Sequence, residues 1–137
     1  MAFEFPIRIY WEDTDAGGIV FYANYLKFFE RARTEWLRAL GLGQRALREQ
    51  SGGMFVVVDA ALKYLRPAHL DDELIVTAQL QEAGRAGLVV AQQALLADPA
   101  TGQRDLLCNG TIRVGWVEAA SMRPARIPAP ILNKLNP

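Results

Sequence analysis

The sequence predicts an α+β fold in which one long helix packs against a curved antiparallel sheet of about five strands. Between residues 24 and 41, apolar side chains recur with the spacing of one helical face. After Gly52-Gly53, apolar and polar residues mostly alternate, as they do in strands. A helix of about 18 residues is roughly 27 Å long, which matches the width of five or six strands. We therefore expect residues 1–137 to form a single domain, with the helix covering one face of the sheet.

The first element along the chain is expected to be a strand at Ile7–Trp11, because this segment alternates and is rich in strand formers. The long helix follows, with Asn24 as its N-cap and Gly41 as the left-handed residue just beyond its C-terminus. The charged residues from Glu30 to Arg38 should form an exposed face with ion pairs. The buried face of the helix is expected to comprise Leu26, Phe29, Ala32, Trp36, Leu37 and Leu40.

The second half of the chain is predominantly β. A short helical segment at residues 43–50 leads into the double glycine. The turn Gly84–Gly87 and the hairpin signal Asp98–Gly102 separate strand-like segments. Because the tail is rich in proline, we expect it to be irregular or to hold only a short helical turn. The expected strands cover residues 54–64, 74–81, 88–97 and 106–117.

Composition and charge exclude several classes of function. The 15 basic and 15 acidic residues balance, so no basic excess points to a nucleic-acid partner. Cys108 and His69 are the only residues of their kinds, which rules out an intrachain disulfide and a multi-histidine metal site. We expect Cys108 to pack as a small apolar residue and His69 to be structural or solvent-facing. No secretory signal or membrane-spanning apolar run is present, so we expect a soluble, cytoplasmic protein.

The segment from Asp13 to Tyr25 carries the most information about function. It places Asp15, the glycines Gly17 and Gly18, and the start of a long helix within a dozen residues. A helix start offers unpaired backbone N–H groups that stabilise a developing oxyanion, and a nearby carboxylate serves as nucleophile or general base. The combination suggests acyl transfer. Asp15 alternatively caps the turn, and Asp13 and Glu12 are rival carboxylates in the same segment.

Three stretches of the chain, residues 12–18, 25–35 and 66–72, resemble the Tol–Pal-associated acyl-CoA thioesterases, which have the hotdog fold. The run from Gly18 to Tyr25 instead resembles the bacterial 4-hydroxybenzoyl-CoA thioesterases, which carry tyrosine where this chain has Tyr22. The resemblance implies hydrolysis of an acyl-CoA and leaves open whether the acyl group is aliphatic or aromatic. A non-catalytic hotdog protein that binds partners is a further alternative. A hotdog dehydratase is disfavoured, because such sites use a histidine and His69 is badly placed for that role.

By this resemblance, Asp15 attacks the thioester carbonyl or activates water for the attack, and the backbone N–H of Tyr22 polarises the thioester oxygen. Gly17 and Gly18 are expected to supply a positive φ or a close approach to the substrate. No metal or redox cofactor is implied, since coenzyme A is part of the substrate.

The resemblance also implies partners for the site. Arg85, in the turn Gly84–Gly87, is the candidate for the phosphates of coenzyme A, with Lys63 and Arg66 as weaker candidates. Hotdog proteins join sheet edges, so we expect a homodimer or homotetramer in which the partner's strand at Met54–Tyr64 lines the acyl pocket. An acyl carrier protein is a further possible partner.

Overall fold

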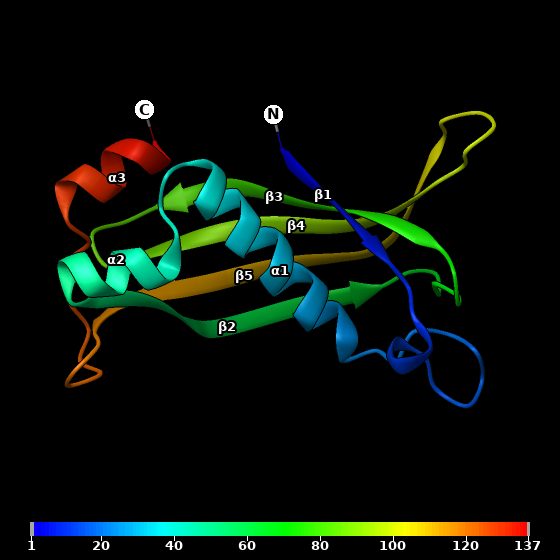
Figure 1. Cartoon of the computed structure of the whole chain (residues 1–137), viewed down its shortest axis with the longest axis horizontal. Helices are drawn as coiled ribbons and strands as arrows, with labels where there is room; N and C mark the ends of the chain where they lie inside the picture. Colours follow the sequence, from blue (N-terminus) through cyan, green and yellow to red (C-terminus); the bar gives the residue numbers. More distant parts are fainter. Residues whose placement is uncertain (1, 137) are drawn as a thin grey trace.

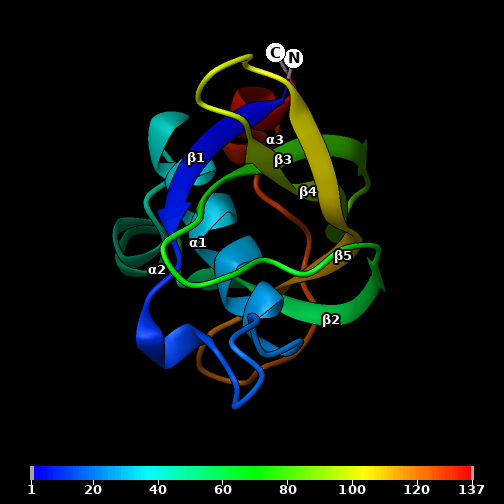
Figure 2. The ribbon, with the colours of Figure 1, turned by 90° about the vertical axis from the view of Figure 1, so that its right-hand side faces the viewer.

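The computed structural model describes residues 2–136 and contains a five-stranded antiparallel sheet with the order β1-β3-β4-β5-β2. Helix α1 lies across the concave face of the sheet, which curves around it (Figures 1 and 2). The predicted α+β fold is confirmed. In chain order the elements are β1 (Phe3–Arg8), the 3-10 turn η1 (Trp11–Asp13), α1 (Asn24–Ala39), α2 (Gln44–Ser51), β2 (Gly53–Tyr64), β3 (Glu73–Ala83), β4 (Gly87–Ala97), β5 (Arg104–Glu118) and α3 (Ala129–Leu135).

The core lies between α1 and the sheet. The predicted helical period is correct, but the buried face is shifted at its N-terminal end, where Leu26 is 43% exposed. One residue turns a helix by about 100°, so Leu26 points sideways when Tyr25 and Phe29 face the sheet. The buried side chains of α1 are Tyr25, Phe28, Phe29, Ala32, Trp36 and Leu37. Gly41 has a φ of +79° just after the helix, as predicted.

The first strand begins and ends earlier than the sequence indicated. Residues 3–8 pair with residues 78–73 of β3, and the chain then leaves the sheet. Trp11 begins the turn η1, which the carboxylate of Asp13 closes by accepting the Tyr10 N–H at 2.8 Å. The C-terminal tail is also more regular than expected. It forms the seven-residue helix α3, in which Ile131 and Leu135 are buried. No helix within residues 2–136 is long and apolar enough to cross a membrane.

The two edges of the sheet differ. Strand β1 has six residues and includes Pro6. Strand β2 has 12 residues, contains no proline, and exposes Val57 (52%) and Val58 (59%). Such a long, apolar, unpaired edge is suited to pairing with another strand. One end of β2 lies beside the loop that precedes α1, and the other lies near α2 and the β3–β4 turn (Figure 1).

Candidate active site

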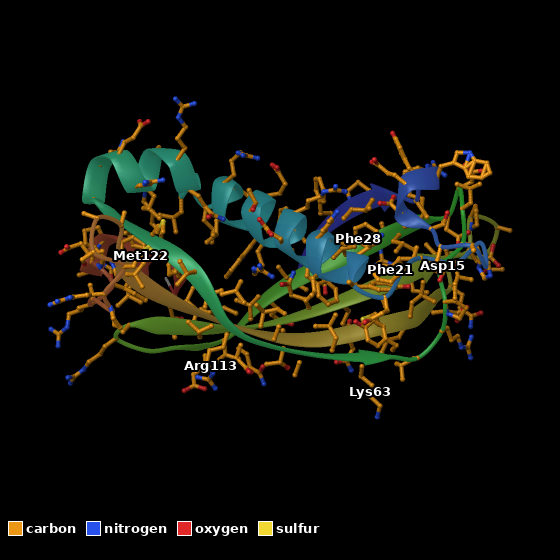
Figure 3. The ribbon with its side chains drawn as sticks, turned by 90° about the horizontal axis from the view of Figure 1, so that it is seen from below. Asp15, Phe21, Phe28, Lys63, Arg113 and Met122 are labelled. Atoms are coloured by element: carbon orange, nitrogen blue, oxygen red, sulfur yellow. The ribbon has the colours of Figure 1, made fainter. Side chains whose placement is uncertain are left out.

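The loop before α1 is a tight turn anchored to the rest of the protein by its backbone. The Asp15 N–H donates to the Ile19 carbonyl at 2.9 Å, and the Gly18 N–H donates to the Asp15 carbonyl at 3.0 Å. The Val20 N–H donates to the carbonyl of Ala68, which follows β2, at 2.9 Å. Residues 15–18 therefore project from one end of the sheet, where Figure 3 shows Asp15 beyond Phe21.

The two glycines of this turn have different geometric roles. Gly18 has a φ of +77°, a conformation that side chains other than glycine rarely adopt. Gly17 allows a close approach, because a Cβ atom at this position would lie 3.2 Å from Oδ1 of Asp15. Gly18 has the expected positive φ, whereas the close contact at Gly17 is with Asp15 of the same turn, so the expected approach to a substrate stays a prediction.

Asp13 and Asp15 have opposite surroundings. Asp13 is buried, and its carbonyl accepts the Phe21 N–H at 2.9 Å and the Asn24 side-chain amide at 2.8 Å. It therefore holds the loop. Asp15 is exposed, and its Oδ1 accepts the Gly17 N–H at 2.8 Å. Within residues 2–136 its Oδ2 makes no hydrogen bond, so this oxygen is free to meet a substrate.

The mouth of α1 differs from the prediction in its cap. Ala23 occupies the N-cap position, and Asn24 is the first helical residue. The Asn24 side chain turns back to Asp13 instead of capping its own helix. Within the described part of the chain, the N–H groups of Tyr22 and Ala23 donate no hydrogen bond. Two backbone donors are thus left for a ligand at the positive end of the helix dipole.

Tyr64, at the end of β2, is a residue of this site that the sequence argument did not single out. Its hydroxyl donates to the Tyr22 carbonyl at 3.0 Å, and its ring lies 6.0 Å from that of Tyr22 and 5.7 Å from that of Tyr25. Burial raises the pKa of Tyr64, so the hydroxyl stays protonated and keeps donating at neutral pH. The only feature of the sequence that could have indicated this role is the position of the tyrosine at the end of a predicted strand, shortly before Pro67.

Cys108 and His69 have the structural roles expected of them. Cys108 pairs with Tyr64 in the sheet and is buried, and desolvation raises the pKa of its thiol to about 12. Such a thiol is not a nucleophile at neutral pH. His69 is exposed, and its backbone N–H donates to Oδ2 of Asp72 at 2.8 Å. Residues 2–136 contain no group of three or more His, Cys, Asp or Glu side chains able to hold a metal ion.

The candidates for phosphate binding do not lie beside Asp15 in one chain. Arg85 sits in the β3–β4 turn, where its carbonyl accepts the Ile127 N–H at 2.8 Å. The neighbouring Gly87 is in register with Gly115 and, through it, with Val56. Tyr64 lies eight positions beyond Val56 on β2, which is about 26 Å of extended strand. The two ends of the sheet therefore carry Asp15 and Arg85 separately.

The two weaker candidates are also outside the Asp15 loop. Lys63 points away from α1 on the far face of the sheet, as does Arg113 (Figure 3). Arg66 lies 3.7 Å from the carboxylate of Asp105 in an exposed ion pair. Lys63 is thus turned away from α1, and Arg66 already has a carboxylate partner.

Comparisons with known proteins show which family the chain belongs to. The family model described as "Thioesterase-like superfamily" matches residues 9–135. The chain is 40% identical over 126 residues to "Acyl-CoA thioesterase YbgC" of Haemophilus influenzae, covering 92% of this chain and 88% of that protein. It is 37% identical over 130 residues to "Acyl-CoA thioester hydrolase YbgC" of Escherichia coli O6:H1, covering 95% and 92%.

A solved structure extends the comparison to the fold. The 4-hydroxybenzoyl CoA thioesterase from Pseudomonas sp. strain CBS-3 superimposes with a TM-score of 0.88. The match covers 97% of this chain and 98% of the other at 21% sequence identity. At that identity the likeness concerns the arrangement of the helix and the sheet.

Proposed function

This chain belongs to the thioesterase-like superfamily of hydrolases, and we propose that it hydrolyses an acyl-CoA thioester to a carboxylic acid and free coenzyme A. One observation supports this function above the others: an exposed carboxylate with a free oxygen, on Asp15, shares a loop with the unpaired N–H groups of Tyr22 and Ala23. Acyl transfer requires both a base or nucleophile and donors for the carbonyl oxygen.

In the proposed reaction, Asp15 starts the displacement at the thioester carbonyl. As general base, its carboxylate takes a proton from water while the water oxygen bonds to the carbonyl carbon. As nucleophile, its own oxygen forms that bond, and water then hydrolyses the resulting anhydride. In both routes the C–S bond breaks when the tetrahedral centre collapses, and the coenzyme A thiolate leaves and takes up a proton. Neither route needs a metal or redox cofactor.

The proposed oxyanion donor is the backbone N–H of Tyr22. A backbone donor does not depend on the side chain, so a tyrosine serves at this position as well as any other residue. The hydrogen bond from Tyr64 to the Tyr22 carbonyl supports the role, because it fixes the peptide next to the donor. A donor that is already oriented needs no reorganisation as negative charge develops on the oxygen.

The proposed active unit is a dimer formed through the β2 edges. Antiparallel pairing of two β2 strands about a twofold axis sets the Asp15 end of one protomer against the Arg85 end of its partner. Each site would then combine Asp15 and Tyr22 of one chain with the Met54–Tyr64 strand and Arg85 of the other. Arg85 would bind the phosphates of coenzyme A. Two such dimers would make a tetramer.

A second candidate substrate is an aromatic acyl-CoA. Tyr22 is 63% exposed, and its ring lies 4.9 Å from that of Phe21 and 6.0 Å from that of Tyr64. This aromatic cluster at the helix mouth would stack against a benzoyl-type group. An acyl carrier protein would present the same thioester to the site on its pantetheine arm.

The function is tested by measuring thiol release from a panel of aliphatic and aromatic acyl-CoAs, with the Asp15→Asn variant alongside. We expect turnover by the wild type and its loss in the variant, which keeps the shape of the side chain and removes its charge. Equal turnover by the two proteins would exclude the mechanism. A preference for 4-hydroxybenzoyl-CoA would select the aromatic candidate. Binding of partners without turnover of any thioester would favour a non-catalytic role.

A further inference from the structure

Arg33 departs from the exposed charged face predicted for α1. Its side chain turns inward, and Nη1 donates to Oε1 of Gln92 on β4 at 2.9 Å. On the exposed part of the same helix, Arg38 pairs with the carboxylate of Glu35. Within residues 2–136, Arg33 has no carboxylate oxygen within 4.0 Å. It is therefore a partly buried cation with only a neutral partner.

Gln92 is locked in the orientation that serves Arg33. It is 1% exposed, and its amide nitrogen donates to the Phe29 carbonyl at 3.0 Å and to the Thr77 carbonyl at 3.1 Å. Both amide hydrogens are used, so the amide oxygen is left to face the guanidinium. Desolvation lowers the pKa of Arg33, and the charge of Glu30 partly opposes that effect. Burial without a close counter-ion is unfavourable for a cation, and an anionic ligand would relieve this cost.

Arg33 also lines a cleft of about 180 Å³ between α1 and the sheet. The other walls are largely apolar and include Trp36, Phe55, Val57 and Leu88. An apolar cavity of about 150 Å³ holds a benzene molecule, so this cleft has room for a short acyl group. The cleft thus combines apolar walls with one guanidinium.

The cleft opens along β2, the edge used by the proposed dimer. If two β2 strands pair along their whole length, Phe55 of one protomer lies opposite Leu62 of the partner. That position is two residues, or about 7 Å, from the partner's Tyr64. Tyr64 contacts Tyr22 at the helix mouth, so the cleft of one protomer would face the Asp15 end of the other.

We propose that this cleft receives the distal end of the acyl group and that Arg33 selects acyl-CoAs whose acyl chain ends in a carboxylate. The inference rests on the proposed function and on its dimer. The guanidinium has five N–H groups, and the protein uses one of them in a hydrogen bond. The others are available to a carboxylate, whose two oxygens match the guanidinium fork. The apolar walls suit the methylene groups between the two ends of the acyl chain.

Glu30 should affect the preference for a terminal carboxylate in the opposite direction to Arg33. It lines the cleft but lies outside ion-pairing distance of Arg33. Its negative charge would weaken the binding of a second carboxylate through repulsion. Neutralising Glu30 should therefore raise the preference for an anionic acyl group, whereas neutralising Arg33 should remove it.

The test compares kcat/KM for adipyl-CoA and hexanoyl-CoA, which have acyl chains of equal length, and repeats the comparison with succinyl-CoA and butyryl-CoA. We expect the wild type to prefer the dicarboxylic member at one length or both. Arg33→Met should lower the ratio of the two kcat/KM values by about 10- to 100-fold, the effect of losing a charged hydrogen bond. Arg31→Met is the matched control, because it removes an exposed charge from the same helix and should leave the ratio unchanged.

Two further variants keep the test decisive if Arg33→Met folds poorly in a thermal unfolding assay. Arg33→Lys keeps the charge without the planar fork and should retain part of the preference. Glu30→Gln should raise the ratio by about threefold or more. The proposal is overturned if the wild type prefers the monocarboxylic substrate at both lengths, or if the Arg33 and Glu30 variants leave the ratio unchanged. Failure of the wild type to cleave any acyl-CoA would instead overturn the proposed function.

Discussion

The two ends of the sheet differ in what they offer a thioester. The Asp15 end has a free carboxylate oxygen, two unpaired backbone N–H groups and the ring of Tyr64. The Arg85 end has a tight turn and a cation, and it lies about 26 Å away along β2 in the same chain. The residues proposed for chemistry and for phosphate binding are therefore separated within one protomer. Under the proposed roles a complete site requires two copies, and the long β2 edge is the proposed element that joins them.

The largest effect is expected at the Asp15 end. Asp15→Asn should lower kcat by about 10²- to 10⁴-fold, because it removes the proposed base or nucleophile and keeps the side-chain shape. Its melting temperature and oligomeric state should stay those of the wild type. Asp13→Asn is the matched control: it changes the buried carboxylate that accepts the Tyr10 N–H, so it should lower the melting temperature. Steady-state kinetics and thermal unfolding separate the two. If the Asp15→Asn variant keeps the wild-type kcat, Asp15 is neither the base nor the nucleophile of the reaction.

The next effect tests whether β2 joins the two ends. Val58→Lys places a charge on the exposed edge without removing a core side chain, since Val58 is 59% exposed and lies at the irregularity in the β2–β5 pairing. We expect the variant to be monomeric in analytical ultracentrifugation and to lose at least about tenfold in kcat/KM, because edge charges oppose strand pairing.

The control for this edge variant is Thr111→Lys, which adds the same charge at an exposed position of β5 away from the edge. It should remain dimeric and active. A monomeric Val58→Lys variant with full activity would show that one chain holds a complete site.

Much of this arrangement was predictable from the sequence, because it depends on local periodicity. The helical spacing gave α1 and the positive φ after it, and alternation gave the strands that follow Gly52. The turn around Asp15 was equally accessible, because glycines and short polar residues act through their own backbone geometry.

The sequence predictions were wrong where a side chain's position depends on a residue far away in the chain. Asn24 caps no helix because Asp13, 11 residues earlier, takes its side chain. Arg33 turns inward because Gln92, 59 residues later, offers an oxygen. Tyr64 reaches Tyr22 only because β2 runs back to the helix mouth. None of these three contacts can be predicted from helical or strand periodicity alone.

A third test asks whether the Arg85 end works in the partner's site. Arg85→Glu should raise KM by about tenfold with little change in kcat, since it replaces the proposed phosphate-binding cation with an anion. The decisive experiment mixes this variant with Asp15→Asn after subunit exchange. If Arg85 serves the partner, about a quarter of the sites in a randomly reassorted mixture are intact. Activity at low substrate should then exceed the average of the separate proteins. No gain would place Arg85 in its own protomer's site or outside both.

The smallest effect should come from the hydroxyl of Tyr64, which holds the Tyr22 peptide and takes no part in the proposed displacement. Tyr64→Phe removes the hydrogen bond to the Tyr22 carbonyl and keeps the ring that packs near Tyr25. A net hydrogen bond of about 1 kcal/mol corresponds to a roughly fivefold loss. The loss should appear in kcat and not in KM, because the oxyanion donor acts on charge that develops in the transition state. If the variant instead has a lower melting temperature and a lower kcat/KM but an unchanged kcat, Tyr64 only packs against the helix.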